Sequence, residues 1–565
     1  MKGLGDLVAK GAKALGITEC GGCSRRRATL NRWVPFGAQG LVAPVQHDSP
    51  RIRPISGGAA AQWYVRESCT NNGNGTSSSC AASPGGTGAW KLFSQIVWGS
   101  IVAGDTLNLV TGETYTQPLT IGSSGIAGSP ITITVSGGGT ATIDVAGVAG
   151  LVGINFNGQS YVTVDGVIGN RVAGQSTYGL RIINNASSAG TNGYCVYENN
   201  GGANNKTMHV ECSGSTTVAL DDNGGGMYLA MRYAEIAYNW IHSTTAPTRW
   251  LGTGITSWSS TGSTAFNDNL VHHNWVQDMQ NDGIRCGANC SLYNNHVQNI
   301  AGSGHSDSLL IQSGGYSAVY NNVVRDSGDQ NIYLDNLYDS ICAHIRVYNN
   351  VIDSDPGFGV VIDPEGGAGA GIVASTCTTG SAAAWDDVVI VNNTFAKTSA
   401  AQIRKGRDKA VTNVVIKNNI FGRHSNPGSY TNLDLRNTID LTLLDANAWD
   451  YDVFDESAVA ALSNYGGVNR TLAQLQALSP AREFHGKLGT PAYVDSAGRD
   501  YHLAASDTVA KNAGVNLTSP YSFLATDKDG LPRPSSGVWD VGAYQAPVAV
   551  AARGRITQVQ RRSAT

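Results

Sequence analysis

The chain has 565 residues, of which 70 are glycine and 14% are charged, and its formal net charge is −4. This composition excludes a long charged helical protein, and the small net charge argues against general binding of nucleic acid. No uninterrupted apolar run reaches membrane-spanning length, and the N-terminus lacks the continuous hydrophobic stretch of a signal peptide. We therefore expect a turn-rich protein with no membrane span.

The first 36 residues combine helical patterning with positive charge. Leu4, Leu7 and Leu15 fall at helical spacing, and a second short helix is expected to end before Pro35. Nine lysines and arginines face three acids before residue 56. Helices this short do not fold alone, so residues 1–36 are expected to dock on a partner.

The same segment contains several short motifs: Gly3-Leu4-Gly5-Asp6, Gly16-Ile17, Cys20, Cys23, Arg26, Leu30-Asn31 and Pro35-Phe36. Through them it resembles a short sequence found in many tailed-phage structural proteins. The resemblance implies that residues 1–36 attach the chain to virion tail proteins, and that the protein belongs to the virion tail and is extracellular after release. The alternative is a basic amphipathic leader of no particular function.

A proline- and glycine-rich stretch, residues 37–60, is typical of a linker. After it, Trp63–Arg66 is expected to open a strand and Trp90–Val97 to form a short amphipathic helix. Because the ends of a solenoid expose unpaired strand edges, this helix is expected to cover the N-terminal end. Ala103–Tyr115 and Gln117–Val145 then resemble the opening of pectin-lyase-like β-helix proteins, which include many carbohydrate-active enzymes.

A repeat between residues 281 and 421 is the strongest signal, because a short apolar strand is followed each time by a pair of asparagines. The first three pairs are 27 and 28 residues apart. Such a period predicts a solenoid of stacked coils, in which asparagine suits a left-handed turn. We therefore predict an all-β fold, a right-handed single-stranded parallel β-helix over residues 61–485. The pairs are Asn294-Asn295, Asn321-Asn322, Asn349-Asn350, Asn392-Asn393 and Asn418-Asn419.

Longer and less regular coils are expected between Ile154 and Trp275. Tyr238-Asn239 and His273-Asn274 take the place of the later asparagine pairs, so His273 is interpreted as a turn residue and not as a catalyst. Trp250 and Trp258 lie on an intervening loop. Their rings either stack on sugar faces or pack the loop onto the helix.

Ten cysteines fall into local pairs. Disulfides that hold loops on a rigid scaffold are one interpretation, and they imply an oxidising final environment. Free buried thiols are the other. A zinc site is disfavoured because Cys20 and Cys23 have no second pair nearby. The pairs are Cys20/Cys23, Cys69/Cys80, Cys195/Cys212, Cys286/Cys290 and Cys342/Cys377.

The C-terminal part begins with a helix predicted over Arg470–Leu478. Residues 486–545 then contain Asp500-Tyr501-His502-Leu503, Asp527, Asp529-Gly530, Arg533-Pro534 and Asp540-Val541-Gly542-Ala543-Tyr544. Through these motifs the segment resembles the closing segment of many bacterial and phage β-helix proteins. The resemblance implies that it seals the C-terminal end. In isolation His502 and Asp540 look catalytic, but both are interpreted as structural. Residues 546–565 are expected to form a loose basic tail.

Strand alternation places one set of polar residues of the repeat on the outside of the helix. We expect these residues to form one exposed stripe, flanked by Tyr333. His305 and Asp307 lie at strand entrances, and Glu365 follows the stripe closely in sequence. The stripe consists of Arg285, Gln312, Asp335, Asp363 and Arg404.

Acids, amides, arginines and an aromatic ring together suit an extended glycan. Carboxyl groups on neighbouring coils can meet the spacing of a glycosidase pair, about 5–5.5 Å for retention or about 6.5–9.5 Å for inversion. The candidate catalytic residues are Asp335, Asp363, Glu365 and Asp307. The candidate substrate-binding residues are Arg285, Gln312, Tyr333, Arg404, His305, Trp250 and Trp258.

A lyase would need a basic group, with arginine or Ca²⁺ beside a uronic carboxylate. Arg285, Arg404 and Lys405 are available, but no lysine–arginine pair on adjacent coils is evident. Hydrolysis is therefore favoured over elimination, and no metal or cofactor is expected unless the chain is a lyase. The competing interpretation is a solvated outer face, which any β-helix shows.

These observations favour a phage tail spike or tail fibre that binds, and in one version depolymerises, a bacterial surface polysaccharide. One alternative is a secreted β-helix polysaccharide hydrolase or lyase. Another is a structural or receptor-binding fibre without catalysis. Phage spikes are commonly trimers, so a homo-oligomer is compatible with the first hypothesis.

Overall fold

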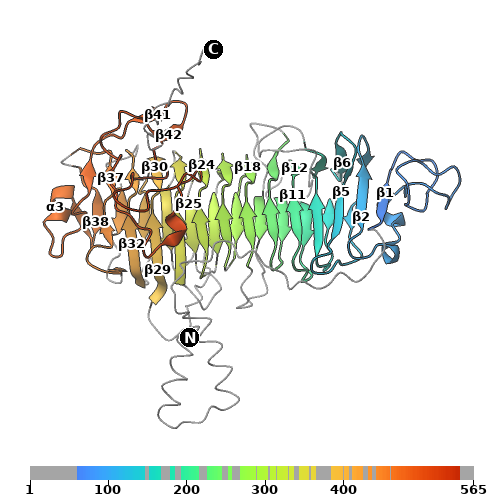
Figure 1. Ribbon diagram of the computed structural model, residues 1–565, viewed down its shortest axis with the longest axis horizontal. Coiled ribbons are helices and arrows are strands. Elements are labelled where there is room, and N and C mark those ends of the chain that lie inside the picture. Colours follow the sequence, from blue (N-terminus) through green and yellow to red (C-terminus); the bar gives the residue numbers. More distant parts are fainter. Residues whose placement is uncertain are drawn as a thin grey trace, which may run out of the picture.

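The chain folds as a right-handed parallel β-helix, seen in the computed structural model with its long axis horizontal (Figure 1). Three sheets run along the axis, and each full coil adds one strand to each sheet. Sheet A has 14 strands, and sheets B and C have 13 each. The predicted fold class is confirmed. The structure describes residues 60–146, 152–166, 178–184, 193–214, 225–244, 252–257, 268–287, 289–302, 306–312, 315–328, 330–335, 343–354, 358–363, 383–398, 400–405, 410–423, 431–435, 441–457 and 460–546.

The strands of each sheet are short and follow the order of the coils. Sheet A contains β1 (Gln62–Val65), β2 (Thr106–Val110), β5 (Ile131–Ser136), β8 (Val162–Asp165), β11 (Lys206–Met208), β14 (Glu235–Ala237), β17 (Leu270–His272), β20 (Ser291–Tyr293), β23 (Ala318–Tyr320), β26 (Ala343–Tyr348), β29 (Ala383–Val391), β32 (Ala410–Lys417), β35 (Leu441–Leu443) and β36 (Trp449–Asp450). Sheet B contains β3 (Thr114–Tyr115), β6 (Ala141–Asp144), β9 (Leu180–Ile183), β12 (Val210–Gly214), β15 (Trp240–Ser243), β18 (Trp275–Gln277), β21 (His296–Gln298), β24 (Val323–Arg325), β27 (Val351–Asp353), β30 (Thr394–Lys397), β33 (Ile420–Phe421), β37 (Val453–Phe454) and β40 (Lys487–Leu488). Sheet C contains β4 (Leu119–Thr120), β7 (Ile154–Asn155), β10 (Tyr194–Glu198), β13 (Gly225–Leu229), β16 (Thr253–Ser257), β19 (Ile284–Cys286), β22 (Leu309–Gln312), β25 (Gln330–Asp335), β28 (Phe358–Asp363), β31 (Ile403–Lys405), β34 (Leu433–Leu435), β38 (Ser463–Tyr465) and the antiparallel β39 (Val468–Arg470).

The interior of the helix is filled by inward-facing side chains that stack from coil to coil. Ile133 of β5 and Val164 of β8 are register partners, and both are fully buried. Near the C-terminal end, Phe395, Phe421 and Phe454 form a column with ring centroids 5.3 and 5.0 Å apart. Burying a side chain of this size contributes roughly 1.5–3 kcal/mol, so the repeated inward positions hold the coils together.

A ladder of buried asparagines runs along the turn between sheets A and B. The backbone N–H and the side-chain amide of each asparagine donate to the side-chain oxygen of the next, and the amide–amide distances are 3.0–3.1 Å. The last asparagine donates instead to Asp452. The predicted turn column is therefore confirmed, and it includes the two earlier positions. The ladder asparagines are Asn239, Asn274, Asn295, Asn322, Asn350, Asn393 and Asn419.

The residue before each ladder asparagine has a left-handed backbone. His273, for example, has a φ of 54°, which confirms its interpretation as a turn residue. We call this outer row the corner row. In the described coils it contains Tyr238, His273, Asn294, Asn321, Asn349, Asn392 and Asn418.

The N-terminal end is covered by the segment before β2. Strand β1 pairs with β2, and Trp90 and Phe93 are buried in the core. The predicted amphipathic helix is wrong in type, because the segment forms two separate 3-10 turns, η1 (Phe93–Gln95) and η2 (Trp98–Ser100). Val97 between them is 55% exposed, since so short a turn has no continuous apolar face.

The C-terminal end is closed by a short helix, α3 (Leu472–Gln476), within the range predicted from sequence. Thr471 caps it through the N–H of Gln474, and Leu472 and Leu475 pack into the main core. Below the helix, Asp452 and Glu483 are fully buried neighbours. Burial raises the pKa of both carboxyl groups.

Residues 489–546, here called the C-terminal strap, lie along the side of the helix. In Figure 1 they form the red segment over the orange and yellow coils. The strap includes the hairpin of β41 (Tyr493–Asp495) and β42 (Asp500–Leu503) and the turn η4 (Ser522–Leu524). The prediction that this segment seals the C-terminal end is wrong, because its apolar side chains pack on the outside of sheets A and B. Leu517, Tyr521, Leu524 and Trp539 meet Tyr348, Val389, Val391, Val415 and Ala448.

Three of the predicted cysteine pairs form disulfides: Cys69–Cys80, Cys195–Cys212 and Cys286–Cys290. The interpretation as free thiols is therefore wrong for these six residues. The second disulfide lies within the core and connects sheet C to sheet B. The predicted pairs Cys20/Cys23 and Cys342/Cys377 lie outside the described residues, as do residues 1–36, 37–59 and 547–565.

Candidate functional site

The outward face of sheet C carries the polar residues that the sequence predicts to form the site. Strand register sorts them into two columns. The first column contains Thr256, Arg285, Leu310, Tyr333, Val361, Arg404 and Asp434. The second contains Gln312, Asp335 and Asp363. The predicted single stripe is wrong. Arg285 and Arg404 lie in register with Tyr333, whereas Asp335 and Asp363 lie two residues further along their strands. Both columns still share one face of the sheet.

Asp335 and Asp363 are register partners on the neighbouring strands β25 and β28. Adjacent strands lie about 4.8 Å apart. The prediction that these two residues occupy equivalent positions on adjacent strands is therefore confirmed for the backbone.

A hydrogen bond between Arg285 and Gln312 joins the two columns. The Nε of Arg285 donates to the Oε1 of Gln312 over 2.5 Å. Gln312 is 3% exposed and Tyr333 is 1% exposed. Tyr333 packs on Leu310 in a cluster separate from the main core. These residues face outward as predicted, but the predicted exposure is wrong for Gln312 and Tyr333, since both are buried.

Asp307, which the sequence predicts as a candidate catalytic residue at a strand entrance, is fully buried. It lies two residues before Leu309 and shares the inward side of the strand. Its backbone N–H donates to Oδ1 of Asp282, which is also buried. The two residues belong to the entrance of sheet C and not to its outer surface.

At the far end of the first column, Arg404 is half-buried and is the register partner of Asp434, which the sequence interpretation missed. Asp434 is 2% exposed. Lys405 is 1% exposed and pairs with Ile362, so it is not available as a surface base. The alternation of apolar and polar residues in the short segment Leu433–Leu435 could have predicted that Asp434 faces outward.

Toward the N-terminus, the first column continues through residues that the sequence interpretation also missed. Tyr197 and Tyr228 are register partners whose rings lie 5.5 Å apart, and both are half-buried. Asn155 and Thr120 precede them on β7 and β4. The outward face thus extends from Thr120 to Asp434. Four further candidates, His305, Glu365, Trp250 and Trp258, lie outside the described residues.

A second polar cluster lies on the outer side of sheet A. Glu235 accepts hydrogen bonds from Lys206 Nζ at 2.7 Å and His272 Nε2 at 3.3 Å. The bond from His272 is the largest cause that lowers the pKa of Glu235, to about 2. His272 and His273 approach through their Nδ1 atoms at 2.8 Å. Burial, followed by the charge of His272, lowers the pKa of His273 to about 4. These contacts link β11, β14 and β17 on the outer side of sheet A.

Within the described parts of the chain, no group of three or more histidine, cysteine or acidic residues is arranged to hold a metal ion. No described helix is both long and apolar enough to cross a membrane.

The comparisons concern shape, since no protein-family model and no curated protein matches the chain. Among solved structures, XylC in complex with xylose aligns over 86% of this chain and 98% of its own, at 10% identity and a TM-score of 0.45. The GH136 lacto-N-biosidase of Eubacterium ramulus aligns over 68% and 67%, at 12% identity and a TM-score of 0.42. The tailspike of E. coli bacteriophage HK620, in complex with a pentasaccharide, aligns over 71% and 59%, at 13% identity and a TM-score of 0.34.

Proposed function

We propose that this protein binds and hydrolyses a polysaccharide along the outward face of sheet C. The observation that carries the proposal is the register of Asp335 with Asp363 on neighbouring strands. Carboxyl groups at such positions can lie about 5–5.5 Å apart, the spacing of a retaining glycosidase pair. The joined pair Arg285 and Gln312 supplies hydrogen-bond donors on the same face.

The proposed chemistry uses both carboxyl groups. Two acids this close push their pKa values apart, so that one holds a proton while the other is ionised. The protonated acid donates its proton to the glycosidic oxygen as that bond breaks. The ionised acid attacks the anomeric carbon to form a glycosyl ester, which water then hydrolyses with the first residue as base.

The test is cleavage of bacterial capsule or lipopolysaccharide by the purified chain, measured as new reducing ends and shorter chains. Asp335→Asn and Asp363→Asn should each lower cleavage by about 100-fold or more, with an unchanged melting temperature. The matched control is Asp495→Asn on an exposed strand of the strap. Full activity of both site variants would reject this pair.

A second candidate is a virion tail spike that uses the same face, and the motif of residues 1–36 favours it. Deleting residues 1–36 should leave the β-helix folded and the glycan bound, but prevent incorporation into virions. Incorporation of the truncated chain would contradict the virion role. Tight binding of a surface glycan that the unmodified chain never shortens would favour a fibre without catalysis.

A further inference from the structure

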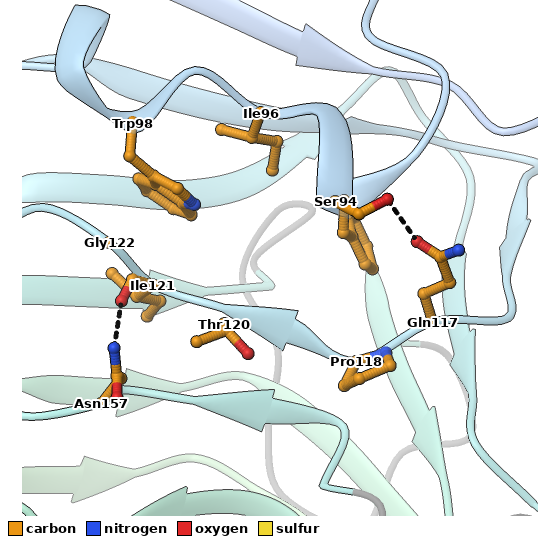
Figure 2. A pocket seen from close by; sticks show the side chains of 10 residues that line it. Ser94, Ile96, Trp98, Gln117, Pro118, Thr120, Ile121, Gly122 and Asn157 are labelled. Atoms are coloured by element: carbon orange, nitrogen blue, oxygen red, sulfur yellow. Dashed lines mark hydrogen bonds between the residues drawn. The ribbon is translucent and has the colours of Figure 1, made fainter.

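A groove of about 560 Å³ opens at the N-terminal end of sheet C. It lies between the segment of the turns η1 and η2 and the strand β4. Figure 2 shows Ile96 and Trp98 on one side of the groove, with Pro118, Thr120 and Ile121 on the other.

The lining of this groove is aromatic, apolar and polar, and none of the described residues that form it is charged. Ser94 Oγ donates to the side-chain oxygen Oε1 of Gln117 at 3.2 Å, so the N–H groups of the same side-chain amide remain donors for a ligand. The hydroxyl of Thr120 is exposed beside them. An aromatic ring with a few amides and hydroxyls suits the apolar face and hydroxyl edge of a sugar. The absence of charge from this lining favours an uncharged sugar over a uronic acid.

Trp98 is held in place before any ligand binds. Its ring lies against Gly122, where an added Cβ would come within 2.6 Å of the indole. Its backbone carbonyl accepts a hydrogen bond of 2.7 Å from Ser123 Oγ. A ring fixed in this way loses little side-chain entropy on binding.

The groove continues directly into the outward face of sheet C. Thr120, in the lining, begins the first column, which proceeds through single register steps to Arg285. Five steps at about 4.8 Å each give a separation of about 24 Å. A chain of several sugars that lies along the face can therefore reach both places.

We propose that this groove is a distal subsite that binds an uncharged sugar of the same polysaccharide. The inference rests on the proposed function, because it takes sheet C as the glycan face. The subsite adds affinity through a second contact on one long ligand, so its contribution grows with the length of the glycan.

The experiment uses the full chain. The test variant adds a side chain that fills the groove, and it leaves the existing lining residues around Trp98 unchanged. Thr120→Phe places a ring in the lining, and Thr114→Phe is the matched control on an exposed position of β3. Saturation-transfer NMR is recorded with galactose, N-acetylglucosamine and glucuronate as probes. We expect Thr120→Phe to reduce transfer to at least one uncharged probe by about 10-fold, the control to change nothing, and glucuronate to show no loss. Equal transfer in the two variants, or a loss confined to glucuronate, would overturn the subsite.

Cleavage of the polysaccharide by the same variants separates this inference from the proposed function. If the subsite exists, Thr120→Phe should raise KM for long chains, while kcat and the KM for short fragments stay unchanged. Cleavage that is unaffected by Thr120→Phe overturns the subsite and leaves the proposed function intact. If the unmodified chain cleaves nothing, the proposed hydrolysis fails, while loss of monosaccharide transfer in Thr120→Phe still supports the groove.

Discussion

The corner between sheets A and B is built in two different ways along the same molecule. In the coils that contain residues 209 to 273, the left-handed positions are aromatic: the ring of Tyr238 stacks on His209 at 5.0 Å and on His273 at 4.7 Å. In the coils from Asn294 to Asn418, the corner row is asparagine. A left-handed backbone costs most L-residues roughly 1–2 kcal/mol, but asparagine tolerates it.

The two kinds of corner differ in which interactions their side chains can make. The aromatic rings offset their strained backbone by stacking on one another, at about 0.5–1.5 kcal/mol per pair. An asparagine needs no such partner, so its amide can bind another segment. Asn349 donates to the Thr526 carbonyl of the strap, and Asn418 exchanges hydrogen bonds with Val515. The strap therefore docks where the corner is asparagine.

The largest effect should come from removing the buried arginine that fixes the strap to this corner. Arg533 donates to Oδ1 of Asn349 at 3.1 Å and to the carbonyl of Gly542 at 2.9 Å. Arg533→Met leaves these buried acceptors without their donor and should cost about 1–3 kcal/mol for each of them. Hydrogen exchange should show the strap amides losing protection while the aromatic-corner coils keep theirs. Lys511→Met, on the same strap, is the control. Loss of protection throughout the molecule would show that the strap is not a separate unit.

The sequence predicted the repeating features because each depends on local spacing. The asparagine ladder, His273 in a turn and the three disulfides all follow from patterns within one or two coils. The two-column arrangement on sheet C could not be predicted, because the loops between coils set the register, and their lengths vary. The position of the strap depends on contacts such as Arg499 with Asp326, which are 173 residues apart. For the site, the sequence predicted which face of the sheet carries the polar residues. It did not predict the burial of Tyr333 and Asp307, because burial depends on neighbouring coils.

Opposite pH responses should distinguish the two regions. Because hydrogen bonds hold the pKa of Glu235 at about 2, its contribution is present above the usual carboxyl range and is lost as the pH falls toward 2. Burial lowers the pKa of His502, but its bonds to Asp500 and Asp529 outweigh burial and raise it overall. Its contribution is present below the usual histidine pKa and is lost as the pH rises through the raised value.

The measurement is hydrogen exchange of both regions against pH. The aromatic corner should lose protection on acidification, and the hairpin of the strap should lose protection as the pH rises through the raised pKa of His502. Glu235→Gln should flatten the first response and His502→Gln the second. If both regions lose protection together in each direction, the two kinds of corner are not energetically independent.

The smallest effect concerns the aromatic corner itself. Tyr238→Asn removes two stacked pairs but relieves the strained backbone, so stability should change by less than about 1 kcal/mol. Tyr238→Ala loses the stacking without gaining a tolerant residue, and should cost about 1 kcal/mol more than the asparagine variant. Chemical denaturation measures both. An asparagine variant that is less stable than the alanine variant would contradict this account of the corner.

The asparagine ladder has a direction, because each coil contributes one asparagine that donates to the asparagine of the next coil. Each amide donates toward the C-terminal end, and the series stops at Asp452, whose Oδ1 accepts hydrogen bonds from both the backbone N–H and the side-chain amide of Asn419. A whole coil with its own asparagine can be added to such a series or removed from it without leaving a donor unpaired, whereas part of a coil cannot. A duplication of one whole coil between Asn239 and Asn419 would therefore keep every ladder donor paired.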